Sequence, residues 1–253
     1  MRRRSAVLLV SAAGAAAAIL LPSIQMKQSV GDTKITGVRL SEPTPIVLGP
    51  SQQIRIGFTV TAQDDSGIRS MSPVGLWGPN YAVVKTSQVT CKALSATTSS
   101  CSGYGVLDTT QRKLWLDNAG WWSLQVQVNA NDGDHFATQR AKTFGVLRRT
   151  QTVIAGVPAQ ARAGERVTIT GQLIQADWGQ HTYTGASGQR LQLRFKPQGS
   201  NSYQPVASVV NAADGSVRAT VTVKGTGSYA WFFTGTHLAA PSHSTDSQVT
   251  VGA

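Results

Sequence analysis

Charged residues are scarce in this sequence, and acidic ones above all. They make up 14% of the 253 residues, against roughly a quarter in an average soluble domain. Glu42 and Glu165 are the only glutamates, and lysine occurs eight times. Because glutamate and lysine are good formers of surface helices, their shortage argues against a helix-rich protein.

Cysteine and catalytic motifs are nearly or wholly absent. Two cysteines allow one disulfide and exclude a disulfide-rich scaffold. The sequence contains no G-x-S-x-G, H-E-x-x-H, P-loop or G-x-G-x-x-G motif. A hydrophobic content of 41% argues against disorder. We therefore predict a folded protein that is not an enzyme.

The N-terminus has the pattern of a targeting segment. Three arginines, Arg2, Arg3 and Arg4, precede an apolar run at residues 6–21. This order is typical of a secretory signal peptide, and an uncleaved N-terminal anchor is the alternative. Either form predicts an extracellular or cell-envelope protein, with membrane contact only through residues 6–21 if the segment is retained.

Past residue 30, apolar side chains recur at every second position, which is the pattern of half-buried β-strands. The clearest stretches are 52–61, 122–128, 167–173, 191–195, 217–223, 229–233 and 249–251. Turn sequences rich in glycine and aspartate separate them. The chain is predicted to be all-β: a signal or anchor segment at 1–29, then two tandem immunoglobulin-like β-sandwich domains at 30–149 and 150–253.

The second half also carries four motifs in order: GERVTITGQL at 164–173, ADWGQHTYTG at 176–185, GQRLQLRF at 188–195 and YAWFFTG at 229–235. They resemble the C-terminal immunoglobulin-like domain of secreted two-domain proteins from high-GC Gram-positive bacteria. Some members of that group are labelled calcium-binding. The first half resembles the partner domain more loosely, through residues 120–122 and 129–134. The resemblance implies an exported protein with an immunoglobulin-like fold.

The two cysteines are expected to form a structural disulfide. Cys91 and Cys101 flank a turn-like stretch rich in serine and threonine. An exported protein folds in an oxidising compartment, where such a bridge persists. No histidine lies near either cysteine, so neither a zinc site nor a nucleophile is indicated.

An acidic loop cluster is the first candidate site. The loop after the second strand and the loop before the last strand lie at one end of such a sandwich. In the first half, these loops carry Asp64, Asp65, Asn131, Asp132 and Asp134. Calcium prefers several such oxygen ligands, which predicts a calcium site. Hairpin turns that hold no ion are the alternative.

The equivalent loops of the second half face the first half and form the second candidate site. Their polar and aromatic residues are Asp177, Trp178, His181, Tyr183, His237 and His243. We predict an interdomain interface that buries Trp178, or else a binding loop. The histidines and Asp177 could ligate zinc, although they lack the usual ligand spacing.

The six tryptophans divide by their expected exposure. Trp115, Trp122 and Trp231 lie within or beside strands and are expected in the core or anchored on a sheet face. Trp77 and Trp121 are the better candidates for exposure. A platform on which sugars stack is a further alternative. Packing is the favoured interpretation, since aromatic residues at strand spacing usually pack.

The positive charge bears on the choice of partner. The formal net charge is +11, and it is spread along the chain rather than clustered, which argues against a nucleic-acid partner. An anionic cell-wall polymer or an unknown protein is expected instead. The sequence thus favours an exported, non-catalytic binding or adhesion module at the cell surface or in secreted form. The alternatives are a calcium-binding or cell-wall-polymer-associated structural protein and an accessory domain pair of a carbohydrate-active system.

Overall fold

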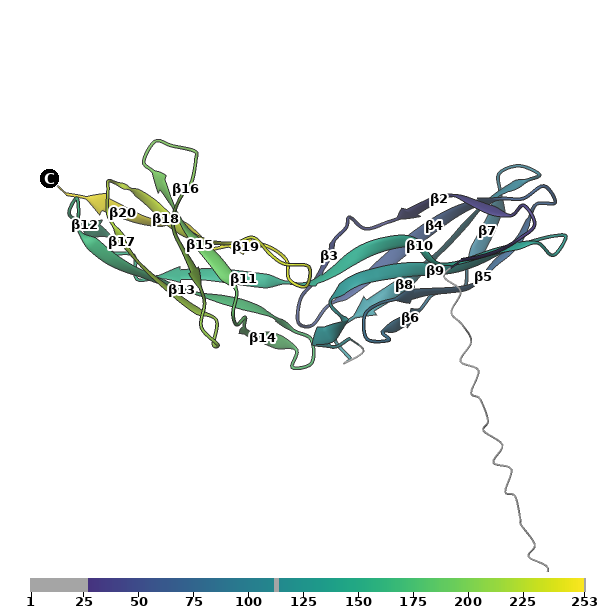
Figure 1. Cartoon of the computed structure of the whole chain (residues 1–253), viewed down its shortest axis with the longest axis horizontal. Helices are drawn as coiled ribbons and strands as arrows, with labels where there is room; N and C mark the ends of the chain where they lie inside the picture. The colour runs from purple at the N-terminus through teal and green to yellow at the C-terminus, as the bar shows by residue number, and fades with distance from the viewer. Residues whose placement is uncertain (1–26, 112–113, 253) are drawn as a thin grey trace, which may run out of the picture.

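The computed structural model describes residues 27–111 and 114–252, and their regular secondary structure is almost entirely β-strand (Figure 1). The predicted signal or anchor segment lies outside the described residues, except for 27–29, which belong to strand β1. Within the described ranges, no helix is both long enough and apolar enough to cross a membrane.

The first half of the chain folds into two sheets. One runs β2–β4–β8–β7 and is antiparallel throughout. The other runs β1–β10–β9–β5–β6, with β3 parallel to β10. The strands are β1 (Lys27–Val30), β2 (Lys34–Leu40), β3 (Ile46–Leu48), β4 (Gln53–Gln63), β5 (Ile68–Trp77), β6 (Val83–Lys85), β7 (Thr90–Ala93), β8 (Thr98–Asp108), β9 (Gly120–Ala130) and β10 (His135–Arg148). One turn of 3-10 helix, η1 (Leu116–Asn118), precedes β9.

The second half forms another pair of sheets. One runs β11–β13–β14, and β17 pairs with the first part of β13 on the same side as β14, opposite β11. The other runs β12–β20–β18–β15–β16, with β19 beside β18. The strands are β11 (Thr150–Ala155), β12 (Gln160–Ala161), β13 (Arg166–Asp177), β14 (Thr182–Gly185), β15 (Arg190–Pro197), β16 (Gln204–Val210), β17 (Ser216–Thr222), β18 (Gly227–Phe233), β19 (Ser242–His243) and β20 (Ser247–Val251).

Both halves have the strand arrangement of an immunoglobulin-like sandwich. In that arrangement strands A, B, E and D share one sheet, and strands C, F and G share the other. In the first half these are β2, β4, β8 and β7, opposite β5, β9 and β10. In the second half β11, β13 and β17 supply A, B and E, opposite β15, β18 and β20. The predicted fold class is confirmed.

Alternation of side chains explains where the core lies. Along β9, Trp122, Leu124, Val126 and Val128 are buried, while the residues between them face outward. Residues of the first half form one buried apolar cluster, and residues around Trp231 in the second half form another. The first cluster also contains two residues from the second half, which are described below.

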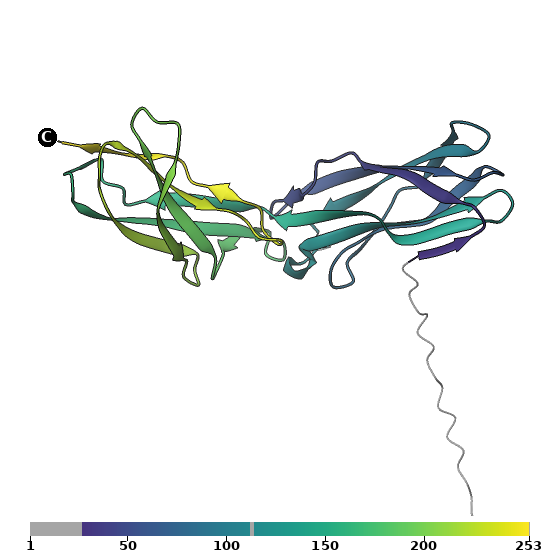
Figure 2. The ribbon, with the colours of Figure 1, turned by 45° about the horizontal axis from the view of Figure 1, so that its top comes forward.

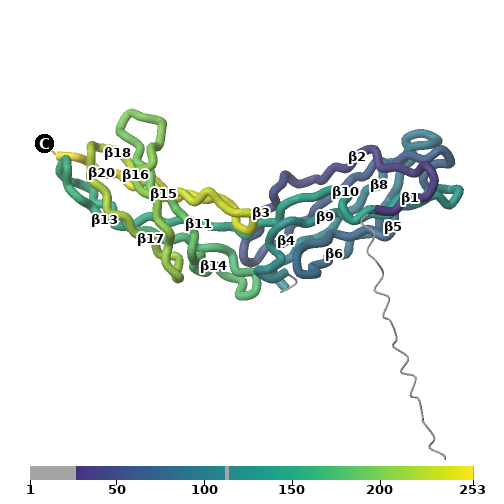
Figure 3. The backbone as a smooth tube through the Cα atoms, viewed as in Figure 1, coloured from purple at the N-terminus to yellow at the C-terminus, as the bar shows by residue number. Residues whose placement is uncertain are grey.

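The two sandwiches lie end to end in an elongated molecule (Figures 1 and 2). Strand β10 ends at Arg148 and β11 begins at Thr150, so Arg149 alone separates them. The tube in Figure 3 shows the chain passing from one sandwich to the other at this point. The end of β13, β14 and the segment before β19 lie beside the same passage (Figure 1).

The predicted disulfide is confirmed. Cys91 on β7 and Cys101 on β8 are direct partners in the antiparallel ladder, with their Cα atoms 3.9 Å apart. The bridge therefore reinforces a hairpin that the backbone already forms.

Candidate functional site

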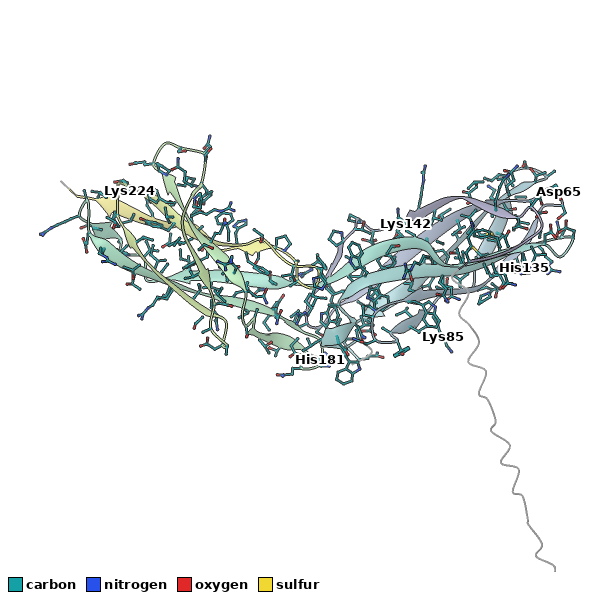
Figure 4. The ribbon with its side chains drawn as sticks, viewed as in Figure 1. Asp65, Lys85, His135, Lys142, His181 and Lys224 are labelled. Atoms are coloured by element: carbon teal, nitrogen blue, oxygen red, sulfur yellow. A yellow bond between two sulfur atoms is a disulfide. The ribbon has the colours of Figure 1, made fainter. Side chains whose placement is uncertain are left out.

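The structure offers three regions for function: the joint between the sandwiches, the acidic loops at the far end of the first sandwich, and a groove on the first sandwich lined by aromatic side chains. Figure 4 places His181 at the joint and Asp65 at the opposite end of the first sandwich.

Trp178 occupies the joint. It lies in the turn between β13 and β14, it is fully buried, and it belongs with Ala176 to the apolar cluster of the first half. Its indole Nε1 donates to the carbonyl of Leu48, 3.4 Å away. Asp177 shapes the turn, because its carboxylate accepts from the amides of Gly179 and Gln180, each at 2.9 Å.

Main-chain hydrogen bonds also tie the joint together. Arg148 donates to Leu238 and accepts from Ala240, and Arg149 donates to Leu48 and accepts from Ala176, all between 2.8 and 2.9 Å. The Arg148 side chain is half-buried, and this burial lowers the pKa of its guanidinium although the charge of Asp177 acts in the opposite direction. Both arginines of the short linker are thus fixed by their backbones.

The remaining residues of this candidate set do not form one site. Tyr183 packs against the first cluster, and the Nδ1 of His181 is buried without a hydrogen-bond partner. His243 stacks on Phe232, with ring centroids 5.4 Å apart, and His237 is exposed. In the described part of the chain, the clusters with three or more metal-ligating side chains contain aspartates alone. The zinc alternative therefore has no ligand set there.

The acidic loops do lie together. The carboxylate oxygens of Asp32, Asp64 and Asp134 lie within 4.8 Å of one another, as do those of Asp64, Asp65 and Asp132. Asp32, in the turn between β1 and β2, is an addition that the sequence did not indicate, because its position depends on the pairing of β1 with β10. The Asn131 amide donates to the carbonyl of Ser66 at 2.7 Å and so links the two loops.

Residues of the surrounding turns donate hydrogen bonds to this acidic cluster. Asp64 is buried and accepts from the Thr33 hydroxyl at 2.6 Å and from the Ser66 amide and hydroxyl at 2.9 and 2.6 Å. Burial acts to raise the pKa of Asp64, but these hydrogen bonds outweigh it and hold that pKa below its usual value. Burial and the charges of Asp65 and Asp64 raise the pKa of Asp32. Calcium binding here stays a prediction.

The third region is a groove of about 890 Å³ on the outer face of the β5–β9–β10 sheet, within the usual size range of ligand sites. We call it the aromatic groove. Its residues are Trp77, Gly78, Pro79, Asn80, Tyr81, Trp121, Trp122, Ser123, Gln125, Gln139, Arg140 and Thr143. Strand register assembles it, because Trp77 and Thr143 are both ladder partners of Ser123.

Exposed rings characterise this groove. Trp77 is 42% exposed, Trp121 67% and Tyr81 95%, whereas Trp122 is fully buried beneath them. The expected exposure of Trp77 and Trp121 is confirmed, and so is the burial of Trp122 and Trp231. The expectation for Trp115 is corrected: it precedes η1 rather than lying on a sheet, and it is 53% exposed.

Two irregular segments form the walls. Residues 78–82 connect β5 to β6, and in this loop Asn80 and Tyr81 both have positive φ, 51° and 61°. On the other side, the pairing of β9 with β10 shifts register between Thr138 and Lys142, which bulges Gln139 and Arg140 out of the ladder. Bulges commonly redirect side chains beside functional sites.

No family model and no curated protein matches the chain. Among solved structures, the fibronectin(III)-like modules of Clostridium thermocellum CbhA align over 84% of this chain and 92% of theirs, at 13% identity and a TM-score of 0.35. Three N-terminal domains of the bacteriophage RB49 outer capsid protein Hoc align over 87% and 71%, at 11% identity and 0.32. At these values the similarities assign no function.

Proposed function

We propose that this protein is an exported, non-catalytic binding module that holds a ligand of the cell surface or its surroundings in the aromatic groove. The observation that carries the proposal is the set of exposed rings, Trp77, Tyr81 and Trp121, around one hollow of about 890 Å³. Contiguous exposed apolar surface of this kind marks interaction sites in soluble proteins.

Two further features support export and a non-catalytic role. The disulfide between Cys91 and Cys101 suits an oxidising compartment, as does the N-terminal arginine and apolar pattern. The side chains lining the aromatic groove, all of them described, include no histidine and no carboxylate, and Arg140 is their one charged group. A resemblance to exported proteins of high-GC Gram-positive bacteria agrees with this proposal.

Retention on sedimented cell envelopes of the producing organism tests the proposed function. We expect the exported protein to sediment with the envelope, and Trp121→Ala to release it. Leu94→Ala is the matched control, because Leu94 is also exposed but lies away from the groove, at the end of β7. If Trp121→Ala is retained as well as the natural protein, the aromatic groove is not the site that binds the envelope.

Attraction to an anionic wall polymer is the second candidate, favoured by the positive net charge, which is +11 for the whole chain including Arg2, Arg3 and Arg4 of the targeting segment and stays positive without them. Such attraction is diffuse and is screened by salt. It predicts retention that is lost on raising salt from about 0.1 M to 1 M, where the Debye length shrinks from about 10 Å to 3 Å. It also predicts that Trp121→Ala has no effect, which separates it from groove binding in the same experiment.

Calcium at the acidic loops is tested separately. If calcium binds there, the melting temperature is higher in millimolar calcium than in chelator, because an ion that binds only the folded state stabilises it. The paired change Asp65→Asn and Asp132→Asn should then remove the difference. A melting temperature that is equal in both buffers would leave these aspartates as turn residues.

A further inference from the structure

We propose that the aromatic groove binds a linear carbohydrate chain, an inference that rests on the proposed function and names its ligand class. The argument has three parts: the rings that the groove presents, the hydrogen-bonding groups beside them, and the continuation of the groove into neighbouring hollows.

The aromatic rings of the groove face solvent rather than packing into the core. Tyr81 is 95% exposed and has a φ of 61°, which is an outlying conformation for a bulky residue. The loop is held in this shape because Gly78 donates to Ala82 at 2.8 Å and Ala82 donates to Pro79 at 3.1 Å. A strained conformation that the surroundings maintain is a mark of functional sites.

Contacts with η1, which follows later in the chain, stabilise the same loop. The Asn80 amide donates to the carbonyl of Asp117 at 2.8 Å, and the Asn118 amide donates to the carbonyl of Pro79 at 3.1 Å. Tyr81 thus lies on a loop that is held by its own backbone hydrogen bonds and by side-chain hydrogen bonds with η1. Aromatic rings on fixed supports offer large apolar faces at low entropic cost, and the C–H faces of pyranose rings are flat apolar surfaces of matching shape.

Uncharged polar side chains that can form hydrogen bonds with sugar hydroxyls also line the groove. Ser123, Gln125 and Gln139 line the groove, and none of the hydrogen bonds found among the described residues uses their side-chain atoms. These hydroxyl and amide groups both donate and accept, as sugar hydroxyls do. The scarcity of charge in the lining fits a largely neutral chain.

The position of the groove argues against an extended peptide. Peptides recognised by sheets add to an exposed edge through their backbone. This groove lies instead on the face of β5, β9 and β10, where β9 is paired on both sides. Backbone groups there are already in the ladder, so recognition falls to side chains.

The groove continues at both ends. A hollow of about 560 Å³ shares Asn80 and Tyr81 with it and adds Trp115. Another of about 340 Å³ shares Trp121 and Thr143 and adds His237 from the second half. Hollows that join at shared aromatic residues suit successive units of one chain, and the second sandwich contributes to one end.

Binding to defined polysaccharides tests this inference. The probes are soluble hexamers and dimers of N-acetylglucosamine and of β-1,4-glucose, together with poly(glycerol phosphate), which has no pyranose ring. We expect saturable binding of at least one hexamer, measured by titration calorimetry, with the hexamer bound more tightly than its dimer. Trp121→Ala and Tyr81→Ala should each weaken binding about tenfold or more, as truncation of an anchor residue does.

Leu94→Ala should bind like the natural protein, and circular dichroism melts of all variants should coincide, which excludes unfolding as the cause. Binding of neither hexamer, or binding of poly(glycerol phosphate) alone, would overturn the carbohydrate assignment. If Trp121→Ala still abolishes envelope retention in that case, the proposed function stands and only its ligand class is wrong.

Discussion

Asp64 keeps its charge through hydrogen bonds rather than through solvent. Burial by itself would raise its pKa, yet the groups that Ser66 and Thr33 donate hold this pKa below the usual 3.8. A carboxyl whose pKa is lower in the folded state stabilises the fold above the unfolded pKa. That contribution is lost as the pH falls through the folded pKa.

Asp64→Asn should therefore change the pH dependence of stability. At pH 7 the loss of hydrogen bonds to a charged group should cost about 1–3 kcal/mol. Below about pH 4 the natural protein should lose stability more steeply than the variant, because only the natural protein has this carboxyl to protonate. Urea unfolding at a series of pH values measures both effects, with exposed Asp65→Asn as the control. Parallel pH profiles for Asp64→Asn and the natural protein would contradict the assignment.

At the scale of elements, the loop from β5 to β6 depends on Gly78. A Cβ there would lie 2.2 Å from the ring of Trp122, which is buried and whose Nε1 is fixed by a 2.8 Å hydrogen bond to the carbonyl of Asn118. We expect Gly78→Ala to cost about 1–3 kcal/mol through overpacking and to displace the loop that carries Tyr81. Gly225→Ala is the control, since its Cβ would meet open space. Equal urea midpoints for the two variants would show that the ring can move aside.

The bridge between β7 and β8 is a second test at this scale. It closes a loop of 10 residues, for which chain entropy predicts a stabilisation of about 2–3 kcal/mol. Replacing Cys91 and Cys101 together by alanine should lower the free energy of unfolding by about that amount, measured in urea. Reduction of the disulfide in the natural protein should lower the free energy of unfolding by a similar amount. If neither the double substitution nor reduction lowers it, the stability of the hairpin comes from its backbone ladder.

The elements also show what the sequence could predict. Period-two runs such as those of β4, β9 and β18 are local, so the alternation of Trp122, Leu124 and Val126 was sufficient to predict a strand and its buried face. The groove was not predictable in this way. Trp77 and Thr143 meet beside Ser123 through the register of three strands, and register depends on pairing between distant segments.

For the whole molecule, the joint decides whether the two sandwiches act as one body. Arg148 and Arg149 form a dibasic pair that a protease such as trypsin would cut in a free linker. Here, however, the amides and carbonyls of both residues are hydrogen-bonded to the neighbouring loops. Trp178 and Ala176 extend the apolar cluster of the first half into the second. A stiff joint would also keep His237 at the end of the aromatic groove.

Limited trypsin digestion should therefore spare residues 148–149 in the natural protein, because a protease needs a segment that can leave its hydrogen bonds. Trp178→Ala should remove the packing that closes the joint, costing about 3–5 kcal/mol as a buried tryptophan does. It should also make this bond pair the first to be cut, while each sandwich retains its circular dichroism spectrum. Exposed Trp121→Ala, which lies outside the joint, should leave the cleavage pattern unchanged. Rapid cutting of the natural protein at this point would show instead that the sandwiches move independently, and a ligand spanning both of them would then have to order the joint as it binds.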